Sequence, residues 1–401
     1  MLLQAGQLLS TAGTQTTALA YPLLVLAVSH SPAQAGVVAF ARIVPFALFG
    51  LFAGVAADRW NRRRLMVAAD GVQAIAMAAL AATILLDRVT VWQIVVVALV
   101  EGTGATFFGA AQPGALRAVV PARQLPDAAG AQETRRAVVR VAGPPLGGML
   151  FALGRAVPFV FDAVSYACSI VSLLLMRTPF QEQRERDSSR VRAQIAEGFR
   201  YLWHQPFLRT TTFLYGLGNF IGPGVLLVLV VVGRRQGLSG GEIGILFAAF
   251  GVASLAGALV SPLLRKALSI RAILLLELWT WLAMLAFVVR PSVYVLLAAM
   301  LPFGVAAPVT DSVVNGYRIA MTPDRLLGRV ESVRSNISLL IAPLGPLVAG
   351  LLLSALSARA TIAFFVGCGL VLALWGTLSP AIRQAPSLDE IEDHVPGLAV
   401  P

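Results

Sequence analysis

The chain alternates between long apolar segments and short polar ones. Twelve of the apolar segments contain about 20 residues each, the length of helix that crosses roughly 30 Å of hydrocarbon. Apolar residues run continuously through each segment and do not alternate with polar ones, which predicts helices and not strands. The predicted spans cover residues 4–28, 33–57, 65–86, 91–112, 128–153, 157–177, 208–232, 242–264, 270–289, 292–313, 330–353 and 360–379. The sequence therefore predicts an all-α polytopic membrane protein with twelve transmembrane helices.

The composition agrees with this prediction and removes other classes of protein. Hydrophobic residues make up 57% of the 401 residues and charged residues 13%, with a mean hydropathy of +0.79, which is too apolar for a soluble globule. The two cysteines, Cys168 and Cys368, lie in apolar runs and are not expected to form a disulfide framework. The three histidines are scattered in loops, so no metal site is predicted. The net charge of +11 is distributed between apolar segments, so no nucleic-acid partner is expected.

The positive residues predict the orientation of the chain. With a cytoplasmic N-terminus, six of the 31 Lys and Arg residues fall in outer loops, Arg42 lies within the second span, and the remaining 24 are cytoplasmic or enter spans from that side. The six outer residues are Arg88, Arg155, Arg234, Arg235, Arg290 and Arg359. We therefore predict a multi-pass protein of the cell (inner) membrane with both termini in the cytoplasm.

The longest polar interruption divides the spans six and six. The halves share Pro-x-Arg at residues 121–123 and 323–325 and Gly-Pro at 143–144 and 345–346, each at an offset of 202 residues. Parallel six-helix repeats with a substrate site between them are typical of transporters. We expect an N-terminal half over 1–177, a cytoplasmic linker over 178–207, a C-terminal half over 208–380 and a cytoplasmic tail over 381–401. Within the linker, apolar residues at helical spacing over 195–203 predict a helix on the inner membrane surface.

One loop carries a recognisable motif. Residues 54–64, after the second span, read GVAADRWNRRR. This segment resembles motif A of the major facilitator superfamily, G-x-L-A-D-R-x-G-R-R, with Val55 or Ala56 in place of Leu and Asn61 in place of the second Gly. Because Asn tolerates left-handed backbone, we expect Asn61 to preserve the turn. Residues 6–10, 110–121, 140–148 and 323–330 are similar to those of drug/proton antiporters related to macrolide-efflux and enterobactin exporters.

The resemblance implies a cytoplasmic gate. It places Asp58 near the N-terminus of the eleventh span, around Gly328 and Arg329, where a carboxylate gains about 0.3–1 kcal/mol from the helix dipole. Asp58 would then latch the two halves together in one state of the transport cycle. The second copy of the motif, residues 264–271, lacks the Asp. The predicted gate residues are Gly54, Asp58, Arg59, Arg62, Arg63, Arg329 and Asp311, the last with Asn315 and Arg318 beside it.

The fifth span contains Gly143, Pro144, Gly147 and Gly148, which resemble the antiporter motif G-P-x-x-G-G of drug exporters. In that family the motif implies a kinked helix along the seam between the halves. Ordinary packing of Gly and Pro in membrane helices is the alternative interpretation.

Charged residues inside spans are functional candidates because burying them in a membrane is costly. Arg42 lies nine residues into the second span and Glu101 ten into the fourth, both from the outer side, so an ion pair is expected. Burial disfavours the ionised form of the Glu101 carboxyl group and the Arg42 charge favours it, a balance that suits proton coupling. A static structural pair is the alternative interpretation. Glu101 takes the Gln position of the drug-antiporter motif R-x-x-Q-G-x-G and Ala98 takes its Arg position. Glu277 and Asp162 are interpreted as structural.

No nucleotide-binding or catalytic motif occurs, so neither an enzyme nor a cofactor is predicted. The leading hypothesis is a monomeric, proton-coupled exporter of small amphipathic compounds such as a drug, antibiotic or siderophore, working by alternating access. Uptake or uniport of a defined metabolite is one alternative, and a non-transporting sensor or assembly protein on the same scaffold is another. The candidate cavity residues are Gln7, Thr11, Thr14, Gln15, Phe107 and Asn219.

Overall fold

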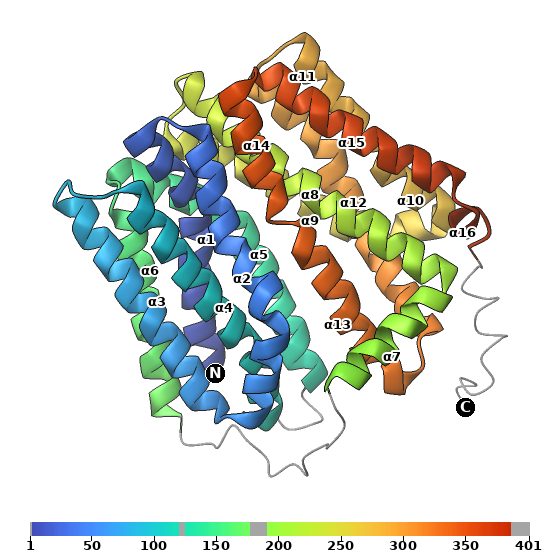
Figure 1. Cartoon of the computed structure of the whole chain (residues 1–401), viewed down its shortest axis with the longest axis horizontal. Coiled ribbons are helices and arrows are strands. Elements are labelled where there is room, and N and C mark those ends of the chain that lie inside the picture. Colours follow the sequence, from blue (N-terminus) through green and yellow to red (C-terminus); the bar gives the residue numbers. More distant parts are fainter. Residues whose placement is uncertain (1, 120–124, 177–190, 386–401) are drawn as a thin grey trace. The chain divides into compact units, whose positions relative to one another are not determined.

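A computed structural model describes residues 2–119, 125–176 and 191–385, and within these ranges all regular structure is helical (Figure 1). The helices of the first half are α1 (Leu2–Ser29), α2 (Pro32–Arg59), α3 (Arg62–Leu85), α4 (Val91–Val119), α5 (Leu125–Leu153) and α6 (Val157–Leu175). The second half, with the linker helix α7, comprises α7 (Val191–His204), α8 (Pro206–Arg235), α9 (Gly240–Ala267), α10 (Ile270–Thr280), the 3₁₀ turn η2 (Trp281–Met284), α11 (Leu285–Val289), α12 (Val293–Met321), α13 (Asp324–Ile341), α14 (Leu344–Ala355), α15 (Ala358–Leu378) and α16 (Pro380–Arg383).

Ten of the twelve predicted spans correspond to helical stretches of the described residues that are long and apolar enough to cross a membrane. Helices α1 and α5 overlap the other two predicted spans. The structure breaks the predicted eleventh span, 330–353, between α13 and α14. Pro343 and Pro346 explain the break, because each lacks the backbone N–H that would continue the helical hydrogen bonds.

Side-chain caps set where several helices begin. Ser31 accepts a hydrogen bond from the Gln34 N–H at the start of α2, and Asn61 accepts one from the Arg64 N–H at the start of α3. The Asn61 backbone is extended, with φ −64° and ψ 112°, so the expected left-handed turn is wrong. Asn61 instead satisfies one of the free N–H groups in the first turn of α3, which an N-cap Asn does well.

By packing, the chain forms two compact units. The first contains Met1–Glu185, Leu226–Gly251 and Pro343–Ser357, and the second contains Arg186–Val225, Val252–Ala342 and Ala358–Pro401. The first unit thus joins the six helices of the N-terminal half to α14 and to parts of α8 and α9. These additions lie around the 236–239 loop and the end of α14, at the side of the chain that the charge pattern predicts to face outward.

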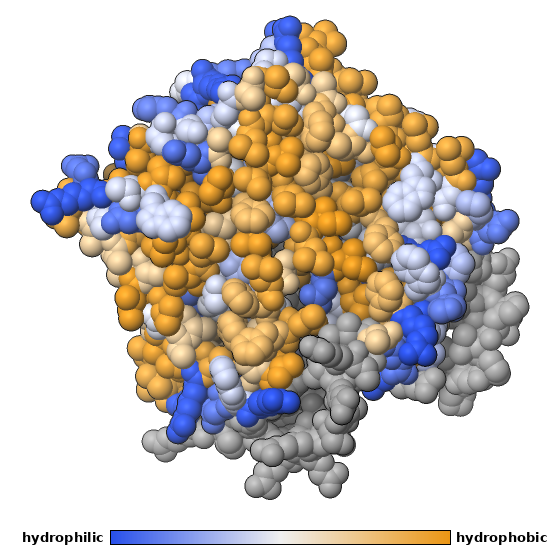
Figure 2. Space-filling model, in the orientation of Figure 1, coloured by the Kyte–Doolittle hydropathy of each residue, from blue (hydrophilic) through white to orange (hydrophobic). Residues whose placement is uncertain are grey.

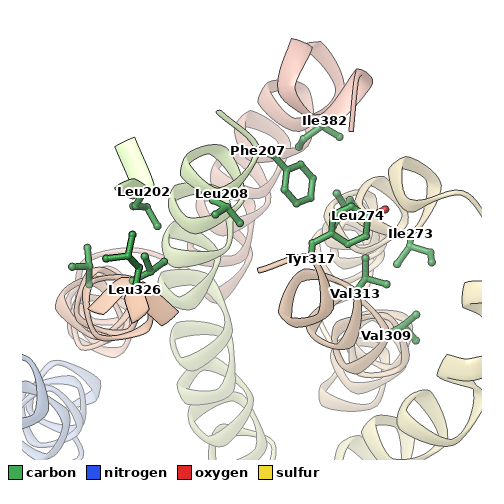
Figure 3. Close-up of a cluster of buried hydrophobic side chains, with 12 residues drawn as sticks. Leu202, Phe207, Leu208, Ile273, Leu274, Val309, Val313, Tyr317, Leu326 and Ile382 are labelled. Atoms are coloured by element: carbon green, nitrogen blue, oxygen red, sulfur yellow. The ribbon is translucent and has the colours of Figure 1, made fainter. Parts of the chain in front are cut away.

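The second unit has its own apolar core, shown in Figure 3. Phe207 of α8 packs its ring on Tyr317 of α12, with ring centroids 5.2 Å apart. Leu274 of α10 and Ile382 of α16 complete this part of the core. The outward faces of the helices are also apolar: hydrophobic residues cover the middle of the view in Figure 2, and hydrophilic ones gather at its margins. Exposed residues such as Ile75 and Leu259 suit contact with lipid tails.

Candidate functional site

The first unit contains an ion pair with a buried carboxylate. Arg42 of α2 and Glu101 of α4 each lie ten residues from the start of their helix, about 15 Å along its axis. Arg42 Nη2 is 2.9 Å from Glu101 Oε1, and Nε donates to Oε1 at 3.2 Å and Oε2 at 3.1 Å. The Glu101 side chain is 1% exposed and that of Arg42 21%. The structure therefore brings the two predicted residues together as a two-pronged, charge-assisted pair.

Local sequence explains why the pair is so close. Gly102 follows Glu101, and a Cβ built on it would lie 2.2 Å from the carbonyl oxygen of Arg42. Any side chain at this position would push α4 away from α2. Glycine allows the two backbones to approach closely, as small residues do between membrane helices.

Helix α1 supplies the next shell of contacts. Arg42 Nη2 donates to the carbonyl oxygen of Thr14 at 2.8 Å, and the Thr14 hydroxyl is hydrogen-bonded to the Tyr166 hydroxyl of α6 at 3.0 Å. The guanidinium also lies over the Tyr21 ring, 5.8 Å from its centroid. These contacts tie α1, α2, α4 and α6 together around one positive charge.

A second carboxyl group lies in the same region. Asp162 of α6 is 0% exposed. Thr17 of α1 donates to its Oδ2 at 3.1 Å, and Ser165 donates to its Oδ1 at 3.2 Å. Asp162 interacts electrostatically with both Glu101 and Arg42. We call the group formed by Thr14, Thr17, Arg42, Glu101, Asp162, Ser165 and Tyr166 the buried polar cluster.

The Gly-Pro motif of α5 has two different neighbours in the first unit. Gly143 and Gly147 face α1, where added Cβ atoms would lie 2.4 Å from the Cβ of Gln15 and 2.2 Å from the carbonyl oxygen of Thr16. Gly148 faces α9, and its added Cβ would lie 2.1 Å from the carbonyl oxygen of Gly240. Pro144 also meets α9, since its carbonyl oxygen lies 3.0 Å from a Cβ built on Gly244.

Helices α2 and α14 make a similar contact. A Cβ on Gly350 would lie 2.4 Å from the carbonyl oxygen of Pro32 and 3.0 Å from the Cα of Gly36. At the rim the Ala33 N–H donates to the Ser354 hydroxyl at 2.9 Å. We call the α2–α14 and α5–α9 contacts together the Gly-Pro closure. It joins helices from both halves of the chain, backbone against backbone.

The motif A residues lie where α2 ends and α3 begins, at the end of α2 away from the Gly-Pro closure. Asp58 belongs to α2, but its side chain lies outside the described residues. Gly54 has open space around it, Arg59 is exposed, Arg62 Nε donates to the Ala57 carbonyl at 3.2 Å, and Arg63 donates to the carbonyl of Leu174 on α6. The predicted latch is therefore untested.

The remaining predicted gate residues lie in the second unit. Arg329 of α13 forms an ion pair with Glu197 of α7, and Asp311 of α12 is exposed. Arg318, expected beside Asp311, forms an ion pair with Glu331 of α13. The linker helix α7 thus packs on α13. Parts of the predicted linker and tail, residues 177–190 and 386–401, lie outside the described residues. The first copy of the Pro-x-Arg repeat, residues 121–123, also lies outside them.

The candidate cavity residues have different environments. Gln7 is buried and its Oε1 accepts a hydrogen bond from Gln112 Nε2 at 2.8 Å, while the Thr11 hydroxyl donates to the Gln7 carbonyl at 2.7 Å. Phe107 makes an edge-to-face contact with Phe52, at 6.1 Å between centroids. In the second unit, Asn219 of α8 is exposed. Thr14 is engaged in the buried polar cluster, and Gln15 lies against α5.

A family model described as "transmembrane secretion effector" matches residues 2–397. The chain belongs to this family of major facilitator transporters. Among its relatives is the multidrug efflux pump Tap of Mycolicibacterium fortuitum, 28% identical over 411 residues that span 97% of each chain. The enterobactin exporter EntS of Escherichia coli O1:K1 is 25% identical over 317 residues, 78% of this chain and 75% of the exporter.

Solved major facilitator structures share the fold. A bacterial homologue of the human lysosomal transporter Spinster, in an inward-facing conformation, superposes with a TM-score of 0.75 and 16% identity over 95% of this chain and 96% of that one. A bacterial homologue of the iron transporter ferroportin gives a TM-score of 0.74 and 17% identity over 94% and 97%. This secretion-effector family member is thus a membrane transporter, not an enzyme.

Sequence reasoning missed two features of this transporter. Asp70 lies eight residues into α3 and is 1% exposed, yet it was not among the candidates. The rule that a charge inside a span is a candidate would have found it. The place of Asp162 beside Thr17 has no comparable signal, because the contact joins residues 145 positions apart.

Proposed function

We propose that the protein exports small amphipathic compounds, such as a drug, an antibiotic or a siderophore, by alternating access. The observation that carries this proposal is the alignment with a multidrug efflux pump over 97% of both chains. The relative named as an enterobactin exporter supports export as the direction. We further propose that the transporter acts as a monomer in the inner membrane, with both termini in the cytoplasm.

The Gly-Pro closure supports alternating access. Its central contacts involve Gly36, Gly148, Gly240 and Gly350 and bring backbone against backbone. Among the described residues, the Ala33 N–H donates a hydrogen bond to the Ser354 hydroxyl across its rim. Such a surface can separate without leaving buried charged groups unpaired, which would be costly. We infer that this closure opens when the substrate leaves toward the outside.

We propose that export is coupled to protons and that Arg42 and Glu101 belong to the coupling machinery. A charged pair in the middle of a membrane protein is costly to bury and is a functional candidate for that reason. The Glu101 side chain is 1% exposed. Arg42 donates a hydrogen bond to the Thr14 carbonyl oxygen of α1. Since α1 also carries Gln7, Thr11 and Gln15, a change in charge beside the pair would act on the helix proposed to meet the substrate.

The cytoplasmic gate is proposed on the family resemblance. Asp58 would act as the latch, with Gly54, Arg59, Arg62 and Arg63 around it. On the other side, Arg329 and Asp311 would complete the gate. The ion pair between Arg329 and Glu197 adds the linker helix α7 to this machinery. The candidate cavity would be lined by residues of α1 together with Phe107 and Asn219.

Flux measurements on purified protein test the proposal. A thermal-shift screen with macrolides, planar lipophilic cations and catecholate siderophores selects the compounds that bind. Proteoliposomes are then given a pH gradient of either sign, and movement of the bound compounds is recorded. Export predicts that compounds move against the direction of proton flow. Accumulation together with protons would establish uptake, and binding without flux in either direction would establish a sensor; either result would refute the proposed export.

A further inference from the structure

The buried polar cluster contains one more carboxyl group than it has cations. Both oxygens of Glu101 accept hydrogen bonds from Arg42, so the positive charge of the guanidinium is paired with that carboxylate. Asp162 is 0% exposed and, among the described residues, its hydrogen bonds come from the hydroxyls of Thr17 and Ser165. With both carboxyls ionised the cluster carries a net negative charge, which a buried site supports poorly. With one proton bound, the cluster is neutral.

The hydrogen bonds around Asp162 suit a neutral carboxylic acid. A hydroxyl has one proton to donate and two lone pairs to accept with. The Thr17 hydroxyl is 3.0 Å from the carbonyl oxygen of Thr14 and 3.1 Å from Asp162 Oδ2. When Asp162 is protonated, its O–H donates to Thr17 and Thr17 donates to the Thr14 carbonyl. When Asp162 is ionised, Thr17 must give up the backbone bond and donate to the carboxylate.

The other titratable groups near Asp162 are placed differently. Tyr21 of α1 and Tyr166 of α6 interact with it electrostatically, as do Arg42 and Glu101. Helix α3, which also packs on α6, contributes Asp70, whose neighbour on α6 is Ser169, seven residues or about 10 Å beyond Asp162. Residues 141–153 of α5, a third neighbour of α6, contain no titratable side chain.

We propose that Asp162 binds and releases the coupling proton, while Arg42 and Glu101 remain an ion pair that sets its surroundings. This proposal rests on the proposed proton-coupled export and assigns its proton site. The reaction is simple protonation: an O–H bond forms on the Asp162 carboxylate as a hydronium ion from one side of the membrane becomes water, and it breaks when the proton passes to water on the other side.

A short chain of contacts links Asp162 to the Gly-Pro closure. On α1, a Cβ built on Gly13 would lie 2.3 Å from Asp162 Oδ1, so the carboxyl touches the helix backbone. Three residues further along α1, the Thr16 carbonyl lies against Gly147 of α5. The next residue of α5, Gly148, meets Gly240 of α9. Protonation of Asp162, by releasing Thr17 to its backbone bond, therefore acts within a few residues of the closure.

Driven transport of ethidium in proteoliposomes tests this assignment. For one-for-one, electroneutral exchange of this monovalent cation with a proton, a gradient of one pH unit sustains about a tenfold concentration gradient. Asp162→Asn is expected to abolish the gradient while ethidium counterflow persists, because counterflow needs no net proton movement. Asp70→Asn, the matched change at another buried Asp, is expected to keep the tenfold gradient. Driven accumulation by Asp162→Asn, or equal loss in Asp70→Asn, would overturn the proposal.

The double change Arg42→Met with Glu101→Gln provides a second test that does not require Asp162→Asn to fold. It removes the ion pair and leaves Asp162 as the titrating group, so one buried carboxyl group should still bind and release a proton as the pH changes. Loss of that titration in the folded double variant would assign the proton to Glu101 and overturn the proposal.

An infrared measurement separates failure of this assignment from failure of the proposed function. In detergent-solubilised protein, the carbonyl stretching band of a protonated carboxylic acid is compared between acidic and alkaline pH. We expect a titrating band that is lost in Asp162→Asn and kept in the double variant. If the wild type moves no ethidium but this band is present, the proposed function fails for that probe and the proton site stands. If Asp162→Asn leaves the wild-type spectrum unchanged, the proton site is wrong.

Discussion

The substitution Gly148→Ala should shift the transporter away from the state with a formed Gly-Pro closure. The added Cβ would lie 2.1 Å from the Gly240 carbonyl oxygen, 2.9 Å from its carbon and 3.3 Å from the Cα of Gly244. All three are backbone atoms, so no side chain can rotate away. Since carbon–oxygen contacts normally lie near 3.3–3.6 Å, α5 and α9 must separate locally by about 1 Å or more.

The magnitude follows from the cost of overpacking. Inserting a methyl group into a well-packed contact costs about 1–3 kcal/mol. A state in which α5 and α9 are apart does not bear this cost, so the whole of it acts on the conformational equilibrium. A difference of about 1–3 kcal/mol corresponds to a shift of roughly 5–150-fold in the population ratio. Gly71→Ala is the matched control, because nothing lies within 4 Å of a Cβ at that helical position.

Disulfide formation across the closure measures this population. Cysteines replace Ala33 and Ser354, whose backbone N–H and hydroxyl oxygen are 2.9 Å apart, in a background without Cys168 and Cys368. The initial rate of cross-linking should fall at least fivefold in Gly148→Ala and stay unchanged in Gly71→Ala. Equal rates in the two variants, both folded, would show that the α5–α9 contact does not control the closure.

Three further outcomes are expected. Glu101→Gln should lower the free energy of unfolding by roughly 3–5 kcal/mol in denaturant unfolding, because it leaves the Arg42 charge buried without its partner. Adding Arg42→Met should recover most of this loss, and no recovery in the double variant would contradict this explanation. Asp58→Asn should insert and fold normally but lose most of its flux in proteoliposomes, and normal flux would reject the latch. A cysteine at Trp60 should resist impermeant thiol reagents added to intact cells and one at Ser31 should react, and the opposite labelling would reverse the predicted orientation.

The sequence by itself determined the spans and the depth of their charges. Lipid offers no hydrogen bonds to the backbone, so each apolar segment of about 20 residues must form a helix. A helix rises a constant 1.5 Å per residue, and counting along α2 and α4 therefore places Arg42 and Glu101 at the same depth. Opposite charges at one depth in a low-dielectric medium favour pairing, and the pair is present at 2.9 Å. Such one-dimensional quantities can be read from the order of residues alone.

Only the tertiary structure decided which helix faces meet. Asp162 joins the cluster because Thr17 of α1 is turned toward α6, and α14 packs on α2 because Gly36 and Gly350 let their backbones touch. These contacts depend on the rotation of each helix about its axis. In a membrane that rotation is set by close packing between partners distant in the chain, since lipid tails are as apolar as the side chains they replace. The apolar pattern therefore carries little information about rotation, and the neighbours of Asp162 emerge only when the helices are assembled.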